Sequence, residues 1–250
     1  MSPLATSLII CVILIGGALT GALLRRLVPE RHLDTHTKDV VRLGCALIAT
    51  IAGLVLGLLI NSAKTSFDAQ SDQVRQLTAN VILLDHLLEQ YGEQTRPIRN
   101  QLRIAAAAVA DRIWNERSSS TTIYLATTAG AAVEQSIRSF TPANDSQRLY
   151  HSQAVQTINA ILQARLALFE QSNVRMPTPF LVVLVFWLFI LFVSFSLFSP
   201  INPMALGAIV VIALSASGAI FLILEMYQPF SGMMQIDSGP LRHALASLAP

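Results

Sequence analysis

The stretch LGCALIATIAGLVLGLLI, residues 43–60, decides the fold class of this chain. It carries no charged residue, and as a helix rising 1.5 Å per residue it is long enough to cross most of a hydrocarbon core about 30 Å thick. The helical form is required because a bilayer core gives backbone N–H and C=O groups no partners outside the segment. A barrel strand would be about 10 residues long and would alternate apolar and polar side chains. This stretch is therefore predicted to be a transmembrane helix.

Three further stretches have the same apolar character, at residues 4–24, 180–198 and 204–224. The first is predicted to be an anchor rather than a cleaved signal peptide, because no basic segment precedes it and Arg25 and Arg26 follow it directly. The whole chain is 53% hydrophobic and 13% charged, whereas soluble domains carry about 25% charged residues. The four apolar stretches and the composition of the whole chain therefore both indicate a membrane protein.

The four spans are predicted to form two hairpins, at residues 4–60 and 180–226, with a C-terminal tail at residues 227–250. Pro200 and Pro203 favour a tight turn in the second hairpin, because proline ends one helix and is tolerated in the first turn of the next. The predicted fold class is an all-α integral membrane protein, in which four transmembrane helices in two hairpins flank an extramembrane helical domain at residues 61–178.

The middle domain shows helical periodicity. Apolar residues recur every three or four positions from residue 74 to residue 91, which indicates one face of an amphipathic helix. The residues of this face are Val74, Leu77, Val81, Leu84, Leu88 and Tyr91. Gly92 and Pro97 are expected to end that helix, which is predicted to continue from the second span without interruption. Further helices are predicted near residues 98–114, 129–138 and 149–169, the last preceded by a turn with good N-cap residues.

The chain shows no catalytic signature: it has no Walker loop, nucleophile elbow, zincin motif or Gly-rich dinucleotide turn. His32 and His36 have a spacing that suits a metal on a helix, but two histidines rarely satisfy zinc, and a hydrated loop of mixed charge is the other reading. Cys11 and Cys45 both lie in apolar stretches, which gives no disulfide framework. We expect no enzyme, no cofactor and no metal, and the net charge of +2 gives no reason to expect nucleic acid.

The second span carries a face of small and weakly polar residues, here called the small-residue stripe: Ala46, Thr50, Gly53, Gly57, Asn61 and Lys64. Two readings are open. Ala49, Gly53 and Gly57 are spaced by four, and small residues at that interval let helices approach closely in lipid. A small, weakly polar stripe that ends in a cation also suits the lining of an anion pathway, with Leu54 beside it as an apolar constriction. Both readings hold if several copies surround an axis.

The fourth span adds further candidates. Ser215, Ser217 and Gly218 are expected to serve helix packing, because hydroxyls in a span bond to backbone carbonyls or to a neighbouring helix. Glu225 lies near the predicted membrane edge. It is either a helix-end charge that reaches water or a charge that serves a pathway or a partner.

The last fifty residues carry a resemblance to a known family. The segments ALSAS at residues 213–217, FLILEM at 221–226 and PFSG at 229–232 resemble the C-terminal signature of the bacterial bestrophin-like family. The resemblance extends over nearly the whole chain. It implies a pentameric, anion-selective channel whose pore is lined by the second helix, with a large cytosolic helical domain. The second span departs from the bestrophin pattern in having no consecutive pore aromatics.

The resemblance also decides the predicted orientation. Five basic residues lie in the first loop, and five lie near the spans on the other side: Lys64, Arg75, Arg165, Arg175 and Arg242. The charge count is tied, and the resemblance places residues 61–178 in the cytoplasm of a bacterium, with the protein multi-pass in the inner membrane. The predicted function is an oligomeric channel that conducts anions, with membrane lipid and further copies of the chain as partners. The alternative is a membrane-anchored sensor or scaffold whose helical domain binds a partner protein; a membrane enzyme ranks last.

Overall fold

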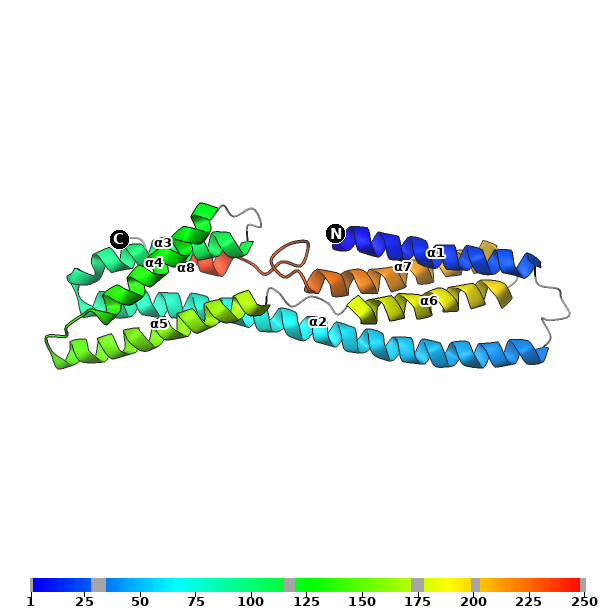
Figure 1. The fold of residues 1–250 in the computed structure, drawn as a ribbon, viewed down its shortest axis with the longest axis horizontal. Helices are drawn as coiled ribbons and strands as arrows, with labels where there is room; N and C mark the ends of the chain where they lie inside the picture. Colours follow the sequence, from blue (N-terminus) through cyan, green and yellow to red (C-terminus); the bar gives the residue numbers. More distant parts are fainter. Residues whose placement is uncertain (1, 28–34, 115–119, 172–177, 199–202, 248–250) are drawn as a thin grey trace. The chain divides into compact units, whose positions relative to one another are not determined.

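The computed structural model describes residues 2–27, 35–114, 120–171, 178–198 and 203–247, and every long element in these ranges is a helix (Figure 1). In chain order the elements are α1 (Pro3–Leu27), α2 (Thr35–Tyr91), the short 3-10 helix η2 (Glu93–Thr95), α3 (Arg96–Trp114), α4 (Ser120–Arg138), α5 (Asp145–Gln171), α6 (Thr178–Phe198), α7 (Pro203–Met226) and α8 (Gly239–Ser247).

Within the described residues, four helices are long and apolar enough to cross a membrane: α1, α2 from Lys38 onward, α6 and α7. Each of the four predicted spans lies inside one of them. The predicted continuity of the second span with the first helix of the middle domain is confirmed, because α2 is a single helix of 57 residues.

The chain folds into two compact units. The first unit contains Met1–Phe67 and Arg175–Gln228, and the second contains Asp68–Val174 and Pro229–Pro250. The C-terminal tail thus groups with the helical domain. Helix α2 contributes its first part to one unit and its second part to the other.

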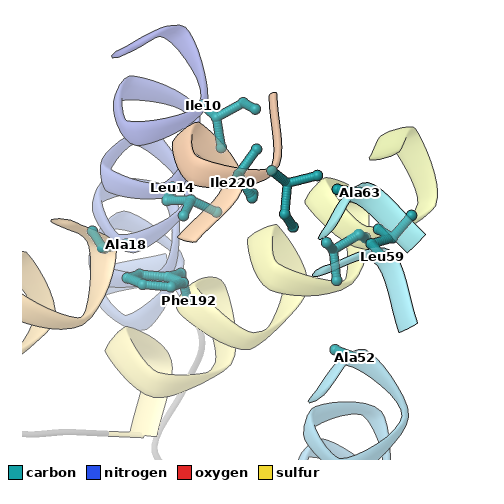
Figure 2. Packing of buried hydrophobic residues seen from close by; sticks show 11 residues of the cluster. Ile10, Leu14, Ala18, Ala52, Leu59, Ala63, Phe192 and Ile220 are labelled. Carbon is teal, nitrogen blue, oxygen red and sulfur yellow. The ribbon is translucent and has the colours of Figure 1, made fainter. Parts of the chain in front are cut away.

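The first unit is built around α1, which packs against α6 and α7. Figure 2 shows Ile10 and Leu14 of α1 near Ile220 of α7, with Phe192 of α6 in the same cluster. The backbones of α1 and α6 approach closely at Gly17 and Gly21. A Cβ added at Gly21 would collide with the carbonyl oxygen of Val193. Small residues at an interface permit this approach, which gains dispersion contacts where lipid offers no hydrophobic driving force.

The second unit has a core of its own. All six residues of the predicted amphipathic face, from Val74 to Tyr91, are buried, which confirms that reading. Helix α2 ends before Gly92, whose φ of 132° lies in a region that side-chain-bearing residues rarely adopt. Pro97 then stands in the first turn of α3, where its missing N–H costs nothing.

The start of α5 shows the predicted cap. The Gln147 backbone N–H donates to Asn144 Oδ1 at 2.7 Å, and the Ala143 N–H donates to Gln147 Oε1 at 2.8 Å. This reciprocal pattern satisfies N–H groups that a helix N-terminus leaves without partners.

Two elements differ from the sequence prediction. Helix α4 begins at Ser120, well before the predicted residue 129, and the tail contains α8, which the sequence reading did not identify. Helix α8 contacts α3 and buries Leu241 and Ala244. The Trp114 indole Nε1–H also donates to the Ile236 carbonyl oxygen at 2.8 Å, which ties the tail to α3. So short a helix depends on this packing, because fewer than about 12 residues are marginal alone.

Candidate functional site

Helix α2 has one packed face in the first unit. Ala52, Leu59 and Ala63 are buried, with exposed fractions of 4%, 6% and 0%, and belong to the same cluster as α6 and α7 residues (Figure 2). Near the end of this packed region the hydroxyls of Ser62 and Tyr227 share a hydrogen bond of 3.3 Å. These contacts fix the rotation of α2 about its own axis within the unit.

The small-residue stripe lies on the opposite side of α2. All six of its residues are exposed, and so is Leu54, at 65%. At 3.6 residues per turn, the centre of the stripe is roughly 140° around the helix from the packed face. The stripe therefore makes up a surface of the protomer and no part of its core.

The two stripe glycines do not serve packing inside the protomer. A Cβ added at Gly53 or Gly57 would meet no described atom within 4 Å. At Gly17 of α1, by contrast, an added Cβ would lie 2.9 Å from Phe189 Cδ2. The stripe glycines thus have open space beside them among the described residues, and Ala49 is exposed next to them.

The stripe carries three polar side chains. The Thr50 hydroxyl donates to the Ala46 carbonyl oxygen at 2.9 Å, so this hydroxyl needs no partner outside the helix. Asn61 and Lys64 follow at the end of the stripe, and both are exposed.

The candidates on α7 divide between surface and interior. Ser215 is exposed and donates to the Val211 carbonyl oxygen at 2.8 Å, and Ser217 is buried and donates to that of Leu214 at 3.1 Å. A Cβ added at Gly218 would meet no described atom within 4 Å. Glu225, one residue before the end of α7, is only 2% exposed. In the protomer this carboxylate therefore does not extend into water.

The second unit contains a partly buried ion pair. Arg99 Nε and Nη2 each donate to one oxygen of Asp85, both at 2.8 Å, and Glu89 lies 3.7 Å from Arg99 Nη1. Asp85 is 7% exposed. The hydrogen bonds to Asp85 raise the pKa of the Arg99 guanidinium above its usual value. This geometry ties α3 to α2 and holds no group in position to react.

The second unit also encloses an apolar cavity of about 40 Å³, with Leu77, Leu102 and Ile158 among its walls and Arg165 at one side. Burial lowers the pKa of the Arg165 guanidinium, and the nearby charge of Arg112 lowers it further. A water molecule needs roughly 10–15 Å³ of such volume. The cavity thus has the volume of about three waters, well below the roughly 300 Å³ at which ligand pockets begin.

The described residues contain no group of three or more metal-ligating side chains. His32 and the side chain of His36 lie outside the described residues.

A model of the bestrophin-like domain matches residues 11–241. The chain belongs to the bestrophin-like family. This match covers both compact units, including most of α1 and the start of α8. The family resemblance inferred from residues 213–232 is thereby confirmed.

The fold is that of solved bestrophin homologues. A tryptophan-to-alanine variant of the bacterial bestrophin homologue from Klebsiella pneumoniae is 14% identical, with a TM-score of 0.71 over 99% of this chain and 96% of that one. Another structure of a bestrophin homologue from that organism is 13% identical, with a TM-score of 0.66 over 94% of each chain. At this identity the likeness shows the fold alone. Among curated proteins, none matches the chain. The all-helical membrane class with four spans is confirmed.

Sequence reasoning missed two features of this bestrophin-like protein. Gly17 and Gly21 form a G-x-x-x-G motif, the usual signal of close helix packing in membranes, and they supply the contact with α6. A groove beside Arg42 and Cys45 was not recognised either, because it depends on the spacing of two helices that are distant in the sequence.

Proposed function

We propose that this bestrophin-like protein assembles into a homo-oligomer around an axis lined by α2 and conducts anions along that axis. The observation that supports this most strongly is the position of the small-residue stripe, fully exposed and opposite the packed face of α2. The family resemblance is the reason to expect five copies.

The composition of the stripe argues against simple lipid contact. A lipid-facing helix surface is usually filled with large apolar side chains, and α2 exposes such residues away from the stripe, at Leu47 and Ile51. Gly53 and Gly57 leave backbone exposed, which offers little contact area to acyl chains. Around an axis, the same small side chains leave room for a passing ion.

The polar residues at the end of the stripe account for the proposed preference for anions. Asn61 amides are able to donate hydrogen bonds to a partly dehydrated anion, and a ring of Lys64 raises the local anion concentration at the mouth. No carboxylate stands among the six stripe residues. Leu54 and Leu58 lie beside the stripe and narrow the path, so that dewetting between them serves as the gate.

Reconstituted protein is expected to pass chloride in a vesicle flux assay, and Lys64→Glu is expected to reduce the preference for chloride over sodium several-fold. Arg242→Glu reverses an exposed charge on α8 and serves as the matched control, with selectivity unchanged. The channel proposal would be wrong if the protein passed no chloride under any condition and the Lys64→Glu variant folded and left the cell phenotype unchanged. Helix α2 would then be a packing element.

The helical domain is proposed to lie in the cytoplasm of a bacterial inner membrane, as the family resemblance implies. Asn144→Cys places an accessible thiol at an exposed position in that domain, once Cys11 and Cys45 are replaced by alanine. Little labelling of intact cells by an impermeant thiol reagent, and strong labelling after lysis, is the expected result. Strong labelling of intact cells would show that the helical domain lies outside the cytoplasm.

A second candidate function rests on the surface of the second unit. Large apolar side chains are exposed there at Ile82, Leu83, Ile104, Leu149 and Leu166. Such side chains favour contact with another protein, which is what a membrane-anchored sensor or scaffold requires. The double variant Ile82→Ser and Leu83→Ser separates the two functions: a scaffold loses its partner, whereas a channel that assembles through its spans keeps its chloride flux.

A further inference from the structure

A groove of about 450 Å³ lies in the first unit, between the first part of α2 and the C-terminal end of α6. Its walls include Arg42, Cys45 and Ala49 from α2, and Ser194, Phe195 and Phe198 from α6. From Val41 to Ala49 the groove follows about 12 Å of helix. Its volume falls within the range of roughly 300–1,000 Å³ that is typical of ligand pockets.

We propose that this groove binds an anionic phospholipid, with one acyl chain lying between α2 and α6 and the phosphate held by Arg42. The groove shares only Ala46 with the small-residue stripe, so most of the groove lies off the proposed conduction path.

The body of the groove suits an acyl chain. Ala46 and Ala49 are small and open the space, while Phe195 and Phe198 supply apolar walls from α6. Phe195 is 44% exposed in the protomer. An empty groove in a membrane-spanning surface would leave these walls without dispersion contacts, which a flexible hydrocarbon chain restores.

The mouth of the groove suits a phosphate. Arg42 is 71% exposed, and its acidic neighbour Asp39 is 62% exposed and 3.9 Å away, so this pair is weak and does not hold the guanidinium. A guanidinium matches two phosphate oxygens at once, with short, charge-assisted hydrogen bonds.

Other cations gather at the same end of the unit. Helices α1 and α6 run in the same direction, because Gly17 contacts Phe189 and Gly21 contacts Val193. The last turn of α1, with Arg25 and Arg26, therefore lies at the same end as Phe198 and the groove mouth.

This charge decides between the two occupants that fit an apolar groove. A second copy that filled the groove with an apolar helix would leave the Arg42 guanidinium with only the weak contact to Asp39 at 3.9 Å. An anionic headgroup is complementary to the cations at this end, as in basic pockets between spans that bind acidic lipids.

Cys45 gives a native reporter of occupancy, because it lines the groove while Cys11 is buried in the core. The full chain with Cys11→Ala is placed in vesicles of phosphatidylcholine alone or of phosphatidylcholine with phosphatidylglycerol. Alkylation of Cys45 by a membrane-permeable maleimide is then followed by mass spectrometry. Phosphatidylglycerol is expected to slow the alkylation about tenfold, the factor that corresponds to 1.4 kcal/mol of preferential binding.

Two variants complete the test. Arg42→Gln is expected to abolish the protection, whereas Arg26→Gln, which lies at the same end but does not line the groove, is expected to keep it. Equal protection in both kinds of vesicle, or protection that survives Arg42→Gln, overturns the proposal. Protection in lipid-free detergent that grows with protein concentration also overturns it, because a neighbouring copy then fills the groove. None of these readouts depends on whether the protein conducts.

Discussion

At the scale of single residues, Gly21 has the most demanding surroundings on α1. A Cβ there would collide with the Val193 carbonyl oxygen on α6, and a backbone atom cannot move aside cheaply. Gly21→Ala is therefore expected to lower stability by roughly 1–3 kcal/mol, the usual cost of overpacking. Thermal unfolding in detergent measures the effect. Gly16→Ala is the control, because an added Cβ there meets no described atom within 4 Å. Equal melting temperatures for the two variants would contradict the close α1–α6 contact.

The Asp85–Arg99 pair is the second residue-scale determinant, now in the helical unit. Arg99→Leu leaves a buried carboxylate without its partner and is expected to cost about 3–5 kcal/mol. The control is Arg96→Leu, which breaks an exposed pair with Glu93 at 3.8 Å and is expected to cost at most about 1 kcal/mol.

The direction of the Arg99 pKa shift determines how its contribution to stability depends on pH. The pKa of Arg99 is raised on folding, so its stabilisation is present at every pH below the unfolded value and is lost only as pH rises through the folded value. The pKa of the unfolded guanidinium already lies far above neutral pH. The difference between wild type and Arg99→Leu, measured by chemical unfolding, should consequently stay constant from about pH 7 to pH 10, where Arg99 remains charged. A difference that shrinks over this range would contradict the assignment.

At the scale of elements, the spans were predictable because bilayer thickness imposes a length on every apolar helix. Residues 180–198 and 204–224 fall within α6 and α7 to within two residues at each end. Helix α8 was not predictable, because nine residues acquire a helical preference only by packing on α3.

The small-residue stripe could likewise be predicted only in part from the sequence. Spacing along the sequence places Ala46, Gly53 and Gly57 on one face of α2, but only the burial of Ala52, Leu59 and Ala63 reveals which face is turned away from the protomer. The groove beside Arg42 required both helices and could not be inferred from either alone.

The cap of α5 gives the element-scale prediction. Asn144→Ala removes the 2.7 Å bond to the Gln147 N–H and is expected to destabilise the helical unit by about 1 kcal/mol. Gln156→Ala, at an exposed position inside the same helix, is the control and is expected to be neutral or slightly stabilising, since alanine has the higher helix propensity. Circular dichroism during thermal unfolding reports the difference. A cap variant as stable as wild type would show that Asn144 contributes nothing to the helix start.

At the scale of the whole molecule, the two units differ in what they contain. The first unit contains the described membrane helices and the exposed small-residue stripe. The second contains an apolar helical core and the ion pair of Asp85 and Arg99. Helix α2 belongs to both. Under the proposed function, a change in the second unit affects stability or assembly, whereas a change in the stripe affects the ion.

Cysteine accessibility along α2 during chloride flux tests the central claim most directly. In a protein whose native cysteines are replaced by alanine, single cysteines are placed at Gly57 and Asn61 on the stripe and at Ala52 and Leu59 on the packed face. An anionic, membrane-impermeant methanethiosulfonate is expected to modify the stripe cysteines and block chloride flux, because they line a water-filled axis. The packed-face cysteines are expected to remain unmodified, with flux intact. A conducting protein whose stripe cysteines resist the reagent would contradict the account.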